Sequence, residues 1–189
     1  GSMVGLWGDR SLNLMVGLIG IHKAGCAYVP LDAGHPPARL ERTLKISGVS
    51  HVVGDGPRPA SWSTDVDWID VGDVSDVGFD LAHPHRIAGD NPAYLIFTSG
   101  STGEPRGVSI GHWQLVYSTR ARMDYYAHGP GTFLLLSSHA FDSSVAGIFW
   151  TLSTGGTLIL PGSDAALDPA SLEHLMRRHA VTSLLCIPS

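Results

Sequence analysis

Residues 93–110 read AYLIFTSGSTGEPRGVSI and predict a strand, a glycine-rich loop and a second strand. Ala93–Phe97 is an apolar run typical of a buried strand, and Val108–Ile110 is a second short β-prone run. Between them, Thr98–Gly107 carries three glycines and four hydroxyl side chains. Glycines let backbone N–H groups turn toward a ligand, and hydroxyls complete a concave anion cradle. Arg106 adds a fixed positive charge suited to phosphate, so the stretch predicts a phosphate-binding loop.

Helical and strand patterns alternate through most of the chain, which predicts an α/β fold with layered, largely parallel sheets. Helices are expected at Leu12–Ala24, from Pro36 to Gly48, and at Trp113–Tyr126, Ser143–Leu152 and Leu167–His179. Further strands are expected at Ala27–Val29 (ended by Pro30), His51–Val53, Val66–Val71, Thr132–Leu136, Thr157–Leu160 and Val181–Ile187. Ser11 is placed to cap the first helix. Residues 54–92, rich in Asp, Gly, Pro and Ser, are expected to form a surface excursion.

Composition narrows the class of protein. The chain has 189 residues, 43% hydrophobic and 15% charged, enough for one sizeable core or two subdomains. A formal net charge of −5 without a basic run argues against nucleic acid as the main partner. No apolar run reaches the ~20 residues of a membrane span, and no signal-peptide pattern is present. Cys26 and Cys186 are therefore expected to be reduced thiols of a cytoplasmic protein.

The glycine-rich loop is neither a Walker A loop nor a dinucleotide fingerprint. Its residues resemble the phosphate-binding motif of the adenylate-forming enzymes, which usually ends Gly-x-Pro-Lys-Gly. Arg106 stands where that lysine is expected and keeps its charge with a different geometry. The resemblance implies that the phosphates of ATP are bound by Thr98, Ser99, Gly100, Ser101, Thr102, Gly103 and Arg106.

Two further motifs carry the same resemblance. Lys23–Asp32 resembles an early motif of the family, with Cys26 in place of a glycine, and is interpreted as structural. Phe141–Ser144 resembles the Phe-Asp-x-Ser motif of the adenylation domains of nonribosomal peptide synthetases. The resemblance implies that Asp142 anchors the α-ammonium group of an amino-acid substrate. The alternative is that Asp142 caps a helix beginning at Ser143.

The same resemblance implies an amino-acid pocket containing Asp142, Ser143, Ala146 and Cys186. Ala146 is small, which predicts a roomy pocket at that point. Asp142 is the only charged residue of the four, which favours a substrate with an uncharged side chain. The alternative for Cys186 is a buried core thiol.

The resemblance runs from Val4 to Ser189, and residues 1–2 look like a tag scar. Residues 3–189 are identified as a partial adenylation domain without the opening segment, the later core motifs and the C-terminal subdomain. The parent protein is thereby expected to activate an amino acid with ATP and Mg²⁺. The aminoacyl group would pass to a carrier protein among the remaining synthetase domains. The isolated chain is expected to be inactive, and the loop at residues 99–106 to be mobile without nucleotide.

Other interpretations remain open at this stage. The chain is alternatively a segment of an acyl- or aryl-CoA ligase, or a non-catalytic remnant with a structural or docking role. His83 and His85 lack the partners of a metal site. Ser99, His139 and Asp142 lack the Gly-x-Ser-x-Gly elbow of a hydrolase. Neither a metal site nor a hydrolase site is therefore indicated more strongly by the sequence than an adenylation domain.

Overall fold

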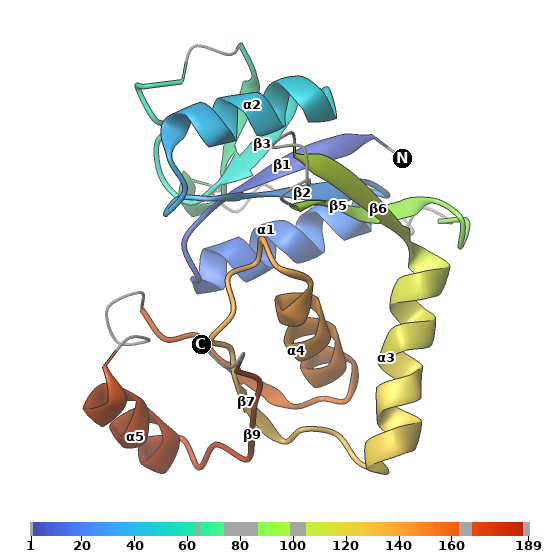
Figure 1. Ribbon diagram of the computed structural model, residues 1–189, viewed down its shortest axis with the longest axis vertical. Coiled ribbons are helices and arrows are strands. Elements are labelled where there is room, and N and C mark those ends of the chain that lie inside the picture. The colour runs from blue at the N-terminus through green and yellow to red at the C-terminus, as the bar shows by residue number, and fades with distance from the viewer. Residues whose placement is uncertain (1, 63–64, 74–86, 99–104, 163–167, 187–189) are drawn as a thin grey trace. The chain divides into compact units, whose positions relative to one another are not determined.

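The computed structural model describes residues 2–62, 65–73, 87–98, 105–162 and 168–186. They belong to two compact units, Gly1–Trp113 and Gln114–Ser189, each with its own sheet (Figure 1). The helices are α1 Leu12–Lys23, α2 Pro37–Ser47, α3 His112–Tyr126, α4 Asp142–Ser153, α5 Pro169–Arg178 and the short 3₁₀ helix η1 Val71–Asp73. The strands are β1 Met3–Gly8, β2 Ala27–Asp32, β3 His51–Gly54, β4 Asp67–Asp70, β5 Pro92–Thr98, β6 Arg106–Gly111, β7 Thr132–Leu134, β8 Thr157–Ile159 and β9 Ser183–Leu184.

The sheet of the first unit has six strands in the order β4-β3-β1-β2-β5-β6. Neighbouring strands are parallel except for β5 and β6, which are antiparallel. Helices cross between the parallel strands, as the alternating pattern predicts. The α/β prediction is therefore confirmed, with an antiparallel edge at the glycine-rich loop.

The core of the first unit is centred on β2, whose residues from Ala27 to Leu31 are buried. Burial on both faces is typical of an inner strand of a parallel sheet. The strand continues past Pro30 to Asp32, further than predicted. Its ladder beyond Tyr28 is formed with β1 alone, since β5 pairs with it only at Tyr28. The missing N–H of proline therefore costs the sheet little.

Polar contacts stabilise both ends of the first helix, α1. The predicted cap is confirmed, because the Ser11 hydroxyl accepts a hydrogen bond from the Leu14 backbone N–H at 3.0 Å. The same hydroxyl donates to Asp55, which also accepts from the Asn13 side chain at 2.9 Å. At the other end, His22 contacts the carbonyl oxygen of Ala93 at 2.9 Å.

The segment predicted as a surface excursion contributes to the core. Trp62 and Val66 are only 6% and 7% exposed, and both join the buried cluster around β2. Trp62 packs edge-on against Trp7 and Trp68. Gly54 lies under Trp68, and a Cβ there would come within 2.2 Å of the indole ring. Part of residues 54–92 is thus packed into the core by tertiary contacts of the tryptophans, although the composition of this segment indicated a surface loop.

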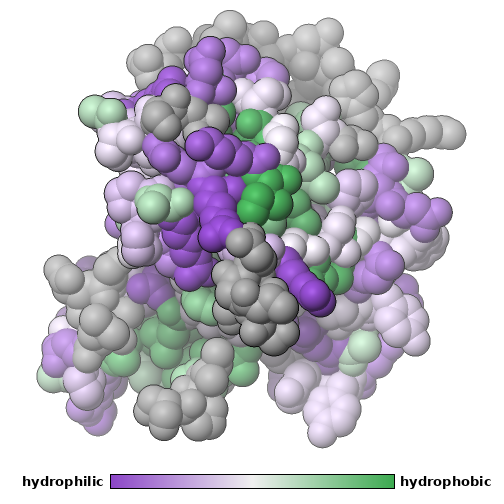
Figure 2. All heavy atoms as spheres, turned by 45° about the horizontal axis from the view of Figure 1, so that its top comes forward, coloured by the Kyte–Doolittle hydropathy of each residue, from purple (hydrophilic) through white to green (hydrophobic). Residues whose placement is uncertain are grey.

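The second unit has a three-stranded parallel sheet in the order β8-β7-β9, with α4 and α5 among its helices. Phe133, Leu134 and Leu135 are buried there, together with Val145 and Ile148 of α4. The strand β9 is shorter than predicted, and Ile187 lies outside the described residues. Figure 2 shows one face of the molecule on which hydrophilic residues predominate around a smaller hydrophobic area.

Candidate functional site

The glycine-rich loop joins two antiparallel strands. In the β5–β6 pair, Thr98 lies opposite Arg106 at the last position of the register. The Thr98 hydroxyl donates to the Arg106 carbonyl oxygen at 3.4 Å, which closes the mouth of the loop. Both residues are exposed. The hairpin thus presents one hydroxyl and one guanidinium side by side at the edge of the sheet, as a site for an anion requires.

The remaining predicted phosphate contacts, Ser99, Gly100, Ser101, Thr102 and Gly103, lie outside the described residues. The expectation that this loop is mobile without nucleotide concerns the same residues and stays a prediction. The structure does describe the two strands that flank these residues. Buried residues of β5 anchor one side of the hairpin, and the exposed strand β6 forms the other.

A cluster of aromatic and histidine side chains lies where β5 begins and β6 ends, at the opposite end of the hairpin from the loop. The ring of His22 is 5.3 Å from that of His112 and 5.6 Å from that of Tyr28, which in turn contacts Tyr94. Burial lowers the pKa of His22, and the neighbouring His112 lowers it further against the opposing effect of the Ala93 carbonyl. Burial also lowers the pKa of His112. Both rings are therefore held as neutral imidazoles at neutral pH.

Asp142 lies in the first turn of α4. The residue in the capping position is Phe141, and no side chain caps the helix. The interpretation of Asp142 as a helix cap is therefore wrong. The Asp142 side chain is exposed and has no hydrogen-bond or ion-pair partner among the described residues. A carboxylate in this position is favoured by the helix dipole and remains available to a cation.

Two predicted pocket residues line the same cavity. Ser143 and Cys186 both border a cavity of about 350 Å³, which we call the Ser143 cavity. Its other lining residues are Leu136, Ser137, Ser138, Phe141 and Leu185. The Ser143 hydroxyl donates to the Ser137 hydroxyl at 2.9 Å. Cys186 is exposed, so its interpretation as a buried core thiol is wrong.

Ala146 borders a second cavity of about 380 Å³, which we call the Arg122 cavity. The two cavities share Leu185 and follow one another along α4. The second is lined by Arg122, Tyr126, His128, Gly129, Pro130, Phe133, Ala146, Gly147, Trp150, Thr182, Ser183, Leu184 and Leu185. Arg122 was not predicted from the sequence, because it belongs to no motif. Its spacing within a predicted helix was the only available signal.

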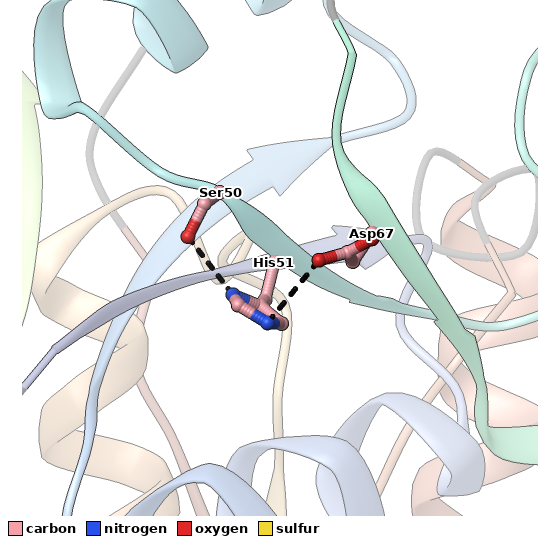
Figure 3. A network of polar contacts seen from close by, with 3 residues as sticks. All are labelled: Ser50, His51 and Asp67. Carbon is pink, nitrogen blue, oxygen red and sulfur yellow. Dashed lines mark hydrogen bonds and ion pairs between the residues drawn. The ribbon is translucent and has the colours of Figure 1, made fainter.

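A serine, a histidine and an aspartate do meet elsewhere in the first unit (Figure 3). The Ser50 hydroxyl lies 2.9 Å from Nδ1 of His51, whose Nε2 is 3.4 Å from the Asp67 carboxylate. The His51 and Asp67 side chains are 53% and 78% exposed and are directly paired across β3 and β4. Exposed pairs of this kind contribute about 1 kcal/mol or less. We assign the network to strand pairing.

Comparison with known proteins identifies the family of the chain. The family model described as "AMP-binding enzyme" matches residues 1–189, and the chain belongs to that family. It is 36% identical over 194 residues to gramicidin S synthase 2 of Brevibacillus brevis, covering 98% of this chain and 4% of that protein. It is 37% identical to the phosphinothricin tripeptide synthetase PhsB of Streptomyces viridochromogenes, covering 100% of this chain and 16% of that protein.

Solved structures agree with these relatives. The four-domain nonribosomal peptide synthetase AB3403, bound to AMP and glycine, matches with a TM-score of 0.85 and 26% identity over 97% of this chain and 14% of that chain. The synthetase FmoA3, bound to α-methyl-L-serine-AMP, matches with a TM-score of 0.79 and 28% identity over 96% of this chain and 20% of that chain. The resemblance to adenylation domains of nonribosomal peptide synthetases is confirmed, and the chain spans a small part of each relative's length.

Within the described residues, no group of three or more His, Cys, Asp or Glu side chains is arranged to hold a metal ion. Across the same ranges, no helix is both long enough and apolar enough to cross a membrane.

Proposed function

We propose that this chain provides the phosphate-binding loop and the amino-acid anchor of a domain that activates an amino acid with ATP. The product would be an aminoacyl-adenylate, formed with release of pyrophosphate. The aminoacyl group would then pass to the thiol of a carrier protein in the same synthetase. ATP use would place this reaction in the cytoplasm.

The observation that carries the proposal is the Asp142 carboxylate at the start of α4, next to the Ser143 cavity, which has no partner among the described residues. An ammonium group is the natural partner for a carboxylate that no residue of the described fold engages. Anchoring the amine there would orient the substrate's carboxylate for attack on the α-phosphorus of ATP. An acid without an amine has no use for this contact, so the proposal favours amino acids over the substrates of acyl-CoA ligases.

The β5–β6 hairpin supplies the second half of the chemistry. Arg106 and the loop residues Ser99, Gly100, Ser101, Thr102 and Gly103 would hold the β- and γ-phosphates, with Thr98 at the mouth. A fixed cation there would stabilise the charge that develops on departing pyrophosphate. Mg²⁺ typically binds through one or two carboxylates together with substrate phosphates. Since the described residues form no three-ligand cluster, we expect Mg²⁺ to enter with ATP.

The test is to place residues 3–189 in the corresponding position of an intact adenylation domain and to measure amino-acid-dependent ATP–pyrophosphate exchange. A panel of amino acids should reveal at least one that supports exchange. Arg106→Gln should reduce that exchange, whereas Arg39→Gln, an exposed arginine on α2, should leave it unchanged. Exchange with no amino acid, in a chimera that folds and binds ATP, would contradict the proposal and favour a structural role.

A further inference from the structure

The Arg122 cavity differs from the predicted pocket in its charge. Its two titratable side chains other than tyrosine are Arg122 and His128, and its lining contains neither aspartate nor glutamate. Arg122 is always protonated. The rings of Tyr126 and Trp150 form an aromatic wall, with centroids 5.0 Å apart and planes tilted by 30°. The cavity is therefore suited to a group that is negatively charged at one end and apolar along its length.

Arg122 keeps most of its hydrogen-bonding capacity. Its Nη1 donates to the carbonyl oxygen and the hydroxyl of Ser118, one turn earlier on α3, at 2.9 and 2.6 Å. No carboxylate among the described residues lies within 4.0 Å of its nitrogens. A guanidinium has five N–H donors, so most remain for a ligand. A planar fork of this kind matches a carboxylate in two-point contact.

The other polar groups of the cavity do not compete for that ligand. The hydroxyl of Ser183 donates to the Pro130 carbonyl oxygen at 3.0 Å, and the Thr182 hydroxyl also donates to it. The indole N–H of Trp150 is buried and has no acceptor among the described residues. The cavity therefore offers more free hydrogen-bond donors than acceptors. A ligand group rich in acceptors would satisfy them.

The cavity lies in line with the proposed amine anchor. Ser143, Ala146 and Trp150 are spaced by three and four residues and share one face of α4. From Ser143 to Trp150 the helix rises about 10 Å. A substrate held at the start of α4 would point its side chain along this face, and Ala146 is too small to stop it there. Only a long side chain would reach the guanidinium beyond.

We propose that the Arg122 cavity receives the carboxylate of an acidic amino-acid substrate with a long side chain, of the glutamate or 2-aminoadipate type. This inference rests on the proposed function, because it takes the ammonium group to lie at Asp142. The four pocket positions derived from the motifs favoured a substrate with an uncharged side chain, and the acidic substrate proposed here takes the place of that expectation. Arg122 acts as a specificity-determining residue that no motif of the sequence marks.

The first test is an NMR titration of the chain itself with L-glutamate, L-2-aminoadipate and L-glutamine, following the side-chain N–H signals of Arg122 and Trp150. The two acids should shift both signals, and L-glutamine should bind at least about tenfold more weakly. Arg122→Gln should weaken binding of the acids by at least about tenfold. The control Arg120→Gln, an exposed arginine on the same helix outside the cavity lining, should bind like the wild type.

Two results would overturn the inference: L-glutamine shifting the signals as readily as the acids, or no shift with either acid. Both comparisons use the wild-type chain and do not depend on the variant's folding. The exchange assay in the chimera separates this inference from the proposed function. Exchange with neutral amino acids but not with acidic ones would contradict the acidic substrate and leave amino-acid activation standing. No exchange, with the NMR shifts retained, would contradict amino-acid activation and leave the carboxylate site standing.

Discussion

The helices α1 and α4 each begin near a carboxylate, and the two carboxylates are used in opposite ways. At α1, Asp55 accepts hydrogen bonds from Ser11 and Asn13 and so holds the start of the helix. At α4, Phe141 occupies the capping position, and the neighbouring Asp142 side chain has no partner among the described residues. A carboxylate engaged by the fold thus stabilises it, whereas one without a partner in the fold is available to a ligand.

The largest effect is expected at Asp142. In the chimeric adenylation domain, Asp142→Ala should remove a charge-assisted contact to a desolvated ammonium group, which costs about 2–4 kcal/mol. At about 1.4 kcal/mol per tenfold, kcat/KM for the amino acid should fall about 30- to 1,000-fold. The melting temperature should stay near that of the wild type. The control Asp124→Ala, an exposed carboxylate on α3, should change neither quantity.

Asp55→Ala should show the opposite pattern in the same chimera. Its two partly buried hydrogen bonds would be lost, and the free energy of unfolding should fall by about 1–3 kcal/mol. The specificity constant should remain within a fewfold of the wild type. Chemical denaturation monitored by tryptophan fluorescence measures the first quantity. If Asp55→Ala instead reduces amino-acid recognition while stability is retained, the comparison between the two helix starts fails.

The C-terminal end of α1 should give a pH dependence. Burial holds the pKa of His22 and that of His112 below the ordinary value of about 6.5 in the folded chain, so the unfolded chain binds protons more readily. Stability should therefore be constant above that pH and fall as the pH drops from about 6.5 toward the lower folded-state pKa values. The slope is at most about 1.4 kcal/mol per pH unit for each histidine. His22→Gln should make the profile shallower; an unchanged profile would mean that His22 is not the titrating group.

The serines near the starts of α1 and α4 should give the smallest effects when each is changed to alanine. Ser11→Ala would leave the Leu14 N–H without its side-chain acceptor and remove one of the two hydrogen bonds to Asp55, and it should cost about 1 kcal/mol of stability. Ser143→Ala is the corresponding change near the start of α4, where the serine hydroxyl donates to Ser137 and, among the described residues, does not bond to the helix backbone. Its effect on unfolding should be smaller than that of Ser11→Ala. Equal losses would mean that α4 depends on a cap of its own.

Sequence patterns found the elements whose stability is local. The cap at Ser11 and the end of the second helix at Gly48 are set by neighbouring residues and were predicted, and Gly48 has the φ of 65° that favours glycine there. The strand β1 was not assigned, because Gly5 and Gly8 interrupt its apolar pattern. Gly5 is explained only by the fold: a Cβ there would lie 2.8 Å from Leu31 and 2.9 Å from Val52. Such a requirement comes from strands distant in the sequence.

The candidate site likewise contains residues that sequence motifs predicted and a residue that only the packing of the helices reveals. Motifs marked Thr98, Arg106, Asp142, Ser143, Ala146 and Cys186, and the structure brings Ser143 and Cys186 to one cavity and Ala146 to the next. Arg122 was missed because its relevance depends on the packing of α3 beside α4 and β9, which no local pattern encodes. The sequence also could not show that Asp142 is no helix cap. A capping aspartate and an aspartate that anchors an ammonium group both stand at the start of a helix.

The central claim is that the carboxylate of Asp142 is kept for an ammonium group. The most direct measurement compares, in the chimeric domain, the specificity constant for the amino acid with that for its desamino analogue, an otherwise identical acid without the amine. The wild type should prefer the amino acid by about 30-fold or more, and Asp142→Ala should reduce this preference to about one. An equally strong preference in the Asp142→Ala variant would contradict the account.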